Sequence, residues 1–162
     1  MAANPCPCGQ YGATDSDCVC TPHVRRKYLA RLSGPLMDRI DIQLRVSRVT
    51  AVRLRLGDEC PSITSAAARQ RVTDARRASA ERLRETPWRL NSEVPGAWLR
   101  GTDRRLSPAT TASIDRALER GGLTMRGYDR VLRLGWSIAD LAGAAIPTAD
   151  HIGRALYLRR AL

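Results

Sequence analysis

Four of the five cysteines lie within fifteen residues of one another, in the segment of the chain richest in reactive side chains. They form two C-x-C pairs separated by nine residues: Cys6, Cys8, Cys18 and Cys20. Two close pairs of thiolates joined by a turn-rich loop supply the tetrahedral set of soft ligands that suits Zn²⁺. We predict a structural zinc site here, with His23 able to replace one sulfur. A loop of free thiols and a redox-active pair of cysteines are the alternatives.

Such a metal would hold the loop together rather than catalyse a reaction, because four protein ligands leave no open position on the ion. The fifth cysteine, Cys60, stands alone directly before Pro61 and is interpreted as an incidental thiol.

The sequence lacks the motifs of several common enzyme classes. It contains no G-x-x-x-x-G-K-[ST] phosphate loop, no acidic Walker B strand, no G-x-S-x-G and no H-E-x-x-H. The two histidines, His23 and His151, have no evident partners for a catalytic triad. We therefore expect the chain to catalyse nothing by itself.

Basic residues dominate the charge of the 162-residue chain. Twenty-seven Lys and Arg residues oppose sixteen Asp and Glu, which leaves a net charge of +11. A codon-biased genome would explain the abundance of arginine but not the shortage of acids. The excess predicts a polyanionic partner, nucleic acid before a membrane, and it is larger in residues 49–162 than in 1–48. We predict no membrane segment and no signal peptide, and hence a cytoplasmic protein.

The elements that must position these residues are mostly helical. The chain has no Phe and few aromatic residues, whereas Ala, Leu and Arg favour helices. N-cap residues followed by proline begin helices at Thr21-Pro22 and Ser107-Pro108. The expected elements are the end of an apolar strand at 1–4, a helix at 23–32 that stops at Ser33, an alternating strand at 40–46, and helices at 62–85, 108–121, 126–145 and from Thr148 to about 160.

These elements predict an α/β remnant over residues 1–48, a connector over 49–61 and a four-helix domain over 62–162. A domain seldom opens on the end of a strand, so we expect the chain to be a fragment.

Several blocks of the sequence are distinctive in combination. The first half contains Ala3-Asn4-Pro5-Cys6-Pro7-Cys8-Gly9, then Cys18-x-Cys20-Thr21-Pro22, and then Ser33-Gly34-Pro35-Leu36-Met37-Asp38-Arg39-Ile40-Asp41. The second half adds Asn91, the stretch 122–133, Ser137-Ile138-Ala139-Asp140-Leu141, and His151 followed by Ala155-Leu156. With these motifs the chain resembles, over nearly its whole length, the magnesium-chelatase-like AAA+ ATPases of the ComM/YifB type.

The resemblance implies the C-terminal part of such a protein. Residues 1–48 would be the end of an AAA+ ATPase core with its cysteine-rich loop, 49–61 a linker, and 62–162 the helical lid, a magnesium chelatase C-terminal-like domain. The whole protein would bind ATP with Mg²⁺ and assemble into a ring, a hexamer. It would couple hydrolysis to DNA remodelling of the branch-migration or helicase-like kind that is linked to competence.

Three residues match functional positions of the family. The resemblance implies that Asn4 is the sensor 1 residue, which orients the attacking water. It implies that Arg39 is the arginine finger presented to ATP on the neighbouring subunit, where a permanently charged, planar guanidinium suits the γ-phosphate. Arg126 would be the sensor 2 arginine of the lid, which reads the nucleotide state.

The chain also departs from the family pattern. It lacks the phosphate loop and Walker B, so nucleotide binding would need residues outside it. Gly135-Trp136 stands where the family usually reads Ala-Arg, which changes the contacts expected on that helix face. A non-catalytic basic module that binds DNA or a whole ATPase is therefore an alternative function. An ATPase subunit of magnesium chelatase is a third.

Overall fold

The computed structural model describes residues 2–12, 18–46 and 63–159. The mostly α prediction is confirmed, and no strand occurs within these ranges. No helix in the described part is long and apolar enough to cross a membrane.

Two short helices follow the cysteine loop, α1 (Pro22–Leu29) and α2 (Gly34–Met37). Thr21 caps α1, and its hydroxyl accepts a hydrogen bond from the backbone N–H of Val24 at 3.4 Å. The predicted start of α1 is confirmed, but the helix ends at Leu29 rather than near residue 32. Ser33, predicted as a helix stop, is also the N-cap of α2.

The strand predicted at 40–46 is wrong, and so is the strand end predicted at 1–4 as far as residues 2–4 are concerned. Ile42, Leu44 and Val46, the last three of the four apolar residues that suggested it, are exposed. The backbone N–H of Gln43 instead bonds to the carbonyl of Leu158 at 2.7 Å. A strand needs a neighbouring strand for its backbone groups, and the described residues provide none.

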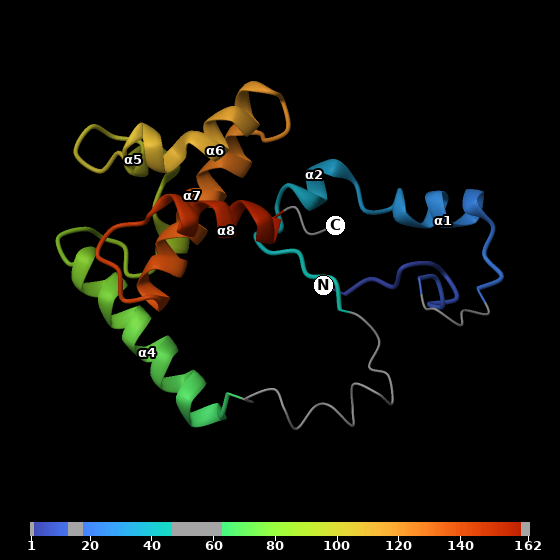
Figure 1. Cartoon of the computed structure of the whole chain (residues 1–162), viewed down its shortest axis with the longest axis horizontal. Helices are drawn as coiled ribbons and strands as arrows, with labels where there is room; N and C mark the ends of the chain where they lie inside the picture. The colour runs from blue at the N-terminus through green and yellow to red at the C-terminus, as the bar shows by residue number, and fades with distance from the viewer. Residues whose placement is uncertain (1, 13–17, 47–62, 160–162) are drawn as a thin grey trace.

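The second half of the chain is a helical body built around α7 (Met125–Leu141), as Figure 1 shows. Helix α7 packs against every other element of this body. These are α4 (Ser65–Arg82), the 3₁₀ turn η2 (Asn91–Glu93), α5 (Gly96–Leu99), α6 (Pro108–Glu119) and α8 (Ala149–Arg159). The predicted start of α6 at Ser107-Pro108 is confirmed. Helix α4 begins at Ser65 with Thr64 as its cap, whereas the predicted cap, Ser62, lies outside the described residues.

The apolar core lies where α7 meets its neighbours. Its fully buried members include Leu83, Ile114, Val131 and Ile152, which come from four different parts of the body. Burial of aliphatic side chains in this way contributes the main favourable term in folding. The helical body therefore has the core that α1 and α2 lack, since neither of these contains a buried residue.

Helix α4 is fixed to α7 by a polar cluster at its C-terminal end. Arg82 donates hydrogen bonds to both carboxylate oxygens of Asp140, at 2.5 and 3.0 Å, and to the side-chain oxygen of Asn91 at 2.7 Å. Its guanidinium also lies over the ring of Trp136, 4.3 Å from the centroid. Trp136, which departs from the family pattern, is therefore a buried core residue that packs beneath an arginine.

Candidate functional site

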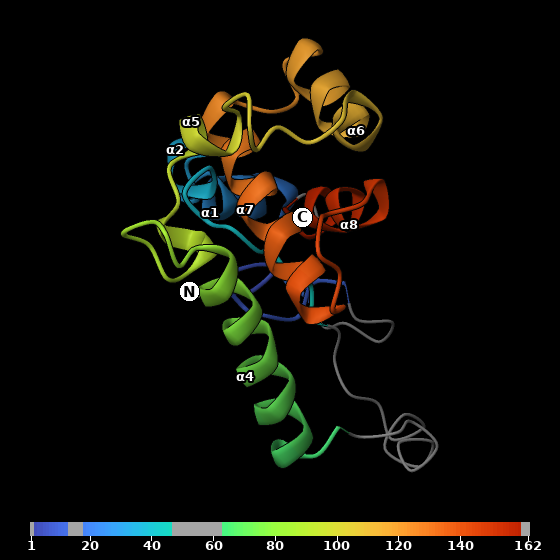
Figure 2. The same cartoon turned by 90° about the vertical axis from the view of Figure 1, so that its left-hand side faces the viewer.

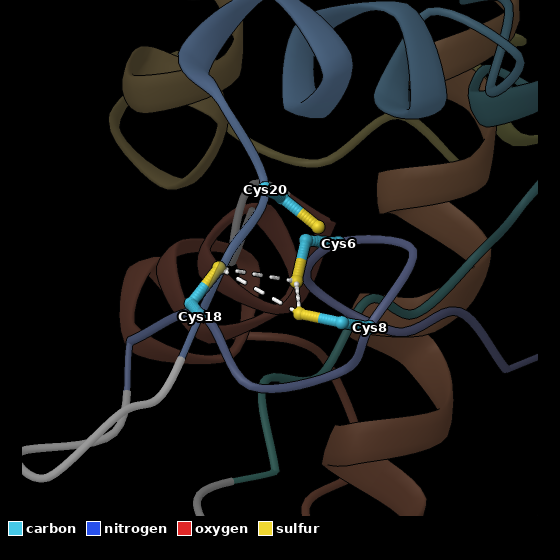
Figure 3. A group of neighbouring side chains, drawn as sticks. All are labelled: Cys6, Cys8, Cys18 and Cys20. Carbon is cyan, nitrogen blue, oxygen red and sulfur yellow. Dashed lines mark hydrogen bonds between the residues drawn. The ribbon is translucent and has the colours of Figure 1, made fainter.

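The four clustered cysteines meet in space, as Figure 3 shows. The sulfur of Cys6 lies 3.3 Å from that of Cys8 and 3.8 Å from that of Cys18, and Cys8 and Cys18 are 3.7 Å apart. All four sulfurs, including that of Cys20, lie within 4.8 Å of one another. Zn–S bonds of about 2.3 Å in a tetrahedron put sulfur atoms about 3.8 Å apart. The donor set and its spacing therefore fit one tetrahedral ion.

His23 does not belong to this cluster, although the sequence offered it as a replacement ligand. The four cysteines are free thiols in this structure. Within the described residues, the group that could hold a metal consists of the four cysteines alone.

The pKa values of two thiols in the loop are shifted in opposite directions. Burial raises the pKa of Cys6, but hydrogen bonds from Cys8 and Cys18 and from the backbone of Tyr11 and Gln10 outweigh it and lower the value to about 6. For Cys20, the backbone of Cys8 acts to lower the pKa. The neighbouring thiols, burial and the charge on Cys6 outweigh that effect and raise it to about 11. The loop therefore favours the thiolate at Cys6 and the protonated thiol at Cys20.

Helix α1 is joined to the cysteine loop by Arg25. Its guanidinium donates to the carbonyl oxygen of Cys20 at 3.0 Å and lies 4.1 Å from the centre of the Tyr11 ring. These contacts couple the direction of α1 to the shape of the loop.

Two carboxylates attach the segment after α2 to the helical body. Asp38 accepts a hydrogen bond from Arg159 of α8 at 2.6 Å and another from the hydroxyl of Thr124 at 3.0 Å. Three residues later, Asp41 pairs with Arg130 of α7. The side chain of Arg159 is buried, so its pairing with Asp38 is largely shielded from water.

Arg39 lies between these two anchors and is exposed. Its guanidinium donates a hydrogen bond to the carbonyl oxygen of Pro35 at 3.4 Å and forms no ion pair within the described residues. The backbone on either side of Arg39 is held, while the charged group itself faces solvent.

Arg126 is exposed and lines an open cleft of about 570 Å³ between the α2 segment and the turn that precedes α7. The same cleft is lined by Asp38, Arg159, Gly121 and Gly122. Neither Asn4 nor Arg39 is among its lining residues. Asn4 is exposed and lies beside Gly9 in the cysteine loop. Of the three family-matched residues, only Arg126 therefore lines this cleft.

The sequence did not predict the anchoring roles of Asp38, Asp41, Arg130 and Arg159. The one available signal for Asp38 and Asp41, the partners of Arg159 and Arg130, was that these two aspartates flank Arg39 in the sequence. No local pattern distinguished Arg130 and Arg159 from the other arginines, because their roles depend on contacts between residues far apart in the chain.

Comparison with known proteins gives two family matches. Residues 62–159 match the family described as magnesium chelatase, subunit ChlI C-terminal, and residues 1–54 match magnesium chelatase, subunit ChlI. An uncharacterised protein of Mycobacterium tuberculosis is 42% identical over 162 residues, which covers 99% of this chain and 31% of the relative.

Two further relatives carry names. Competence protein ComM of Haemophilus influenzae is 33% identical over 159 residues, covering 98% of this chain and 30% of its own length. The Escherichia coli protein YifB is 31% identical over 162 residues, with the same coverage. The chain therefore spans about a third of the length of the relatives it matches.

Proposed function

Since this chain belongs to the family of the C-terminal part of magnesium chelatase subunit ChlI, we propose that it is the C-terminal part of a ring-forming AAA+ ATPase. The whole protein would be a cytoplasmic hexamer that binds ATP with Mg²⁺ and couples its hydrolysis to DNA remodelling. The relative named as a competence protein and the net charge of +11 support this proposal.

The observation that carries the proposal is the setting of Arg39. An arginine that completes the ATP site of a neighbouring subunit must extend its side chain from the surface of its own subunit. Its backbone must nevertheless be held, so that the guanidinium has a fixed position in the neighbouring site. Asp38 and Asp41 hold the backbone through Arg159 and Arg130, and the guanidinium between them is exposed. Arg39 would supply positive charge to the γ-phosphate in the transition state.

Arg126 and Asn4 would act on the subunit's own nucleotide. The exposed guanidinium of Arg126 faces a cleft roomy enough for part of a nucleotide, and it would report whether the γ-phosphate is present. The carboxamide of Asn4 would orient water once the rest of the ATPase core surrounds it. Asp38 pairs with Arg159 at the same cleft, so occupancy of the cleft and the position of Arg39 would be linked.

The test is Arg39→Ala in the whole protein that contains this chain. ATP hydrolysis should fall by at least about 10³-fold, while ATP affinity measured by equilibrium binding stays the same. The matched control is Arg45→Ala, which removes another exposed arginine of the same segment and should leave hydrolysis unchanged. Retained hydrolysis by the Arg39 variant would overturn the assignment.

We also propose that Cys6, Cys8, Cys18 and Cys20 hold one structural Zn²⁺. The sulfur spacing and the four free thiols of the loop support this, and the ion would fix a loop that has little apolar core of its own. Binding would release the thiol protons and change no oxidation state. The ion would keep the loop in contact with Arg25, and thereby fix the direction of α1.

Elemental analysis of the chain purified without added metal tests this second proposal. We expect one zinc per chain in the parent and a large loss in Cys8→Ser. Cys60→Ser is the matched control, since it removes the one cysteine outside the cluster, and it should keep its zinc. A folded parent without metal, or equal zinc in both variants, would rule the site out.

A further inference from the structure

Helix α4 carries three of its arginines along one side. Arg69, Arg76 and Arg77, called here the arginine ridge, fall within about a third of the helix circumference at 3.6 residues per turn. The ridge spans about 12 Å at 1.5 Å per residue. All three are exposed.

The charges of the ridge are available to a ligand. Arg69 and Arg76 form no ion pair within the described residues. Arg77 pairs with Asp74 at 3.6 Å, and both side chains are more than half exposed. Such exposed pairs are worth little, so a phosphate group could replace the carboxylate at small cost.

The helix that carries the ridge is held firmly at one end and projects at the other. Arg82 attaches its C-terminal end to Asp140 and Asn91, whereas Ser79 is the only buried residue within the helix. Figures 1 and 2 both show the N-terminal part of α4 extending away from the helical body. The N-terminal part of the ridge therefore lies on the projecting part of the helix.

We propose that the arginine ridge binds the phosphate backbone of duplex DNA. Helix α4 contains no aromatic residue, whereas surfaces that bind single strands stack bases on exposed aromatic rings. Arginines spread along a straight helix match instead the regularly spaced phosphates of a duplex, whose major groove is wide enough to admit an α-helix. The inference rests on the proposed DNA partner and identifies the surface that contacts it.

The experiment measures binding of the full 162-residue chain to a labelled duplex and to one of its separated strands, at increasing salt concentrations. The test variant is Arg69→Gln with Arg76→Gln. The matched control is Arg71→Gln with Arg120→Gln, which removes the same charge from exposed arginines outside the ridge. Glutamine preserves helix propensity, and circular dichroism checks the fold of each variant.

We expect the slope of log affinity against log salt on the duplex to become shallower by about 1.8 in the ridge variant, because each lost phosphate contact accounts for about 0.9. The control variant should keep the slope of the parent. Equal losses in both variants would overturn the ridge while leaving DNA as the partner. An equal or larger effect on the single strand would overturn the duplex assignment. No binding by the parent at low salt would overturn both the ridge and the DNA partner, while the ATPase test of Arg39 would still stand.

Discussion

At the scale of single residues, the surroundings of each arginine decide what it does. Arg82 is held against Asp140 and fixes α4 to α7. Arg159 is held against Asp38 and fixes the segment after α2 to the helical body. Arg39 and Arg126 are exposed, and their charge is free to meet a ligand. The sequence alone cannot separate these classes, because the carboxylate partners of Arg82 and Arg159 lie 58 and 121 residues away along the chain.

Tyr128 gives a pH-dependent prediction. Burial and the neighbouring Asp115, which accepts the phenol's hydrogen bond at 2.8 Å, raise its pKa from 10.0 to about 12. The folded state therefore favours the protonated phenol, a stabilisation that is complete below about pH 10 and lost as the pH rises toward 12. Urea unfolding should show a steeper loss of stability over this range in the parent than in Tyr128→Phe. Parallel curves for the two proteins would contradict the shifted pKa.

At the scale of elements, helix starts were the most predictable feature. A capping residue followed by proline marked α1 and α6 correctly, because both groups act locally on the first turn. The strand predicted at 40–46 is wrong because a strand needs a second strand beside it. The alternation of apolar and polar residues says nothing about whether that second strand is present. The cysteine cluster was predictable from spacing, whereas the anchoring of Arg39 depended on distant residues.

The attachment of α4 to α7 should depend on Asp140. Asp140→Ala would leave Arg82 without its carboxylate in a mostly buried site, since the side chain of Asp140 is 2% exposed and that of Arg82 17%. We expect a loss of about 3 kcal/mol in the free energy of unfolding, measured by urea denaturation of the chain. Glu81→Ala, which breaks an exposed pair with Arg84, is the control and should cost less than about 1 kcal/mol. Similar losses in the two variants would refute a structural role for the buried pair.

At the scale of the whole molecule, the two parts of the chain differ in how many apolar side chains they bury. The helical body is stabilised by an apolar core, whereas residues 2–12 and 18–46 bury one apolar side chain, Cys6. The segment with Arg39 is attached to the body through Asp38 and Asp41, so a movement of α7 and α8 would carry the arginine with it. This arrangement suits a protein in which one subunit acts on the next.

The most direct measurement is a mixing experiment with the whole protein. The Arg39→Ala variant would be mixed with a variant that cannot bind ATP, each being inactive alone. If Arg39 acts across subunits, the mixture should regain ATP hydrolysis, because an ATP-free subunit can still present its arginine to a neighbour that holds ATP. A protein carrying both changes would provide the inactive control. A mixture that forms joint rings and yet hydrolyses no ATP would contradict the account, and so would full activity of the Arg39→Ala variant alone.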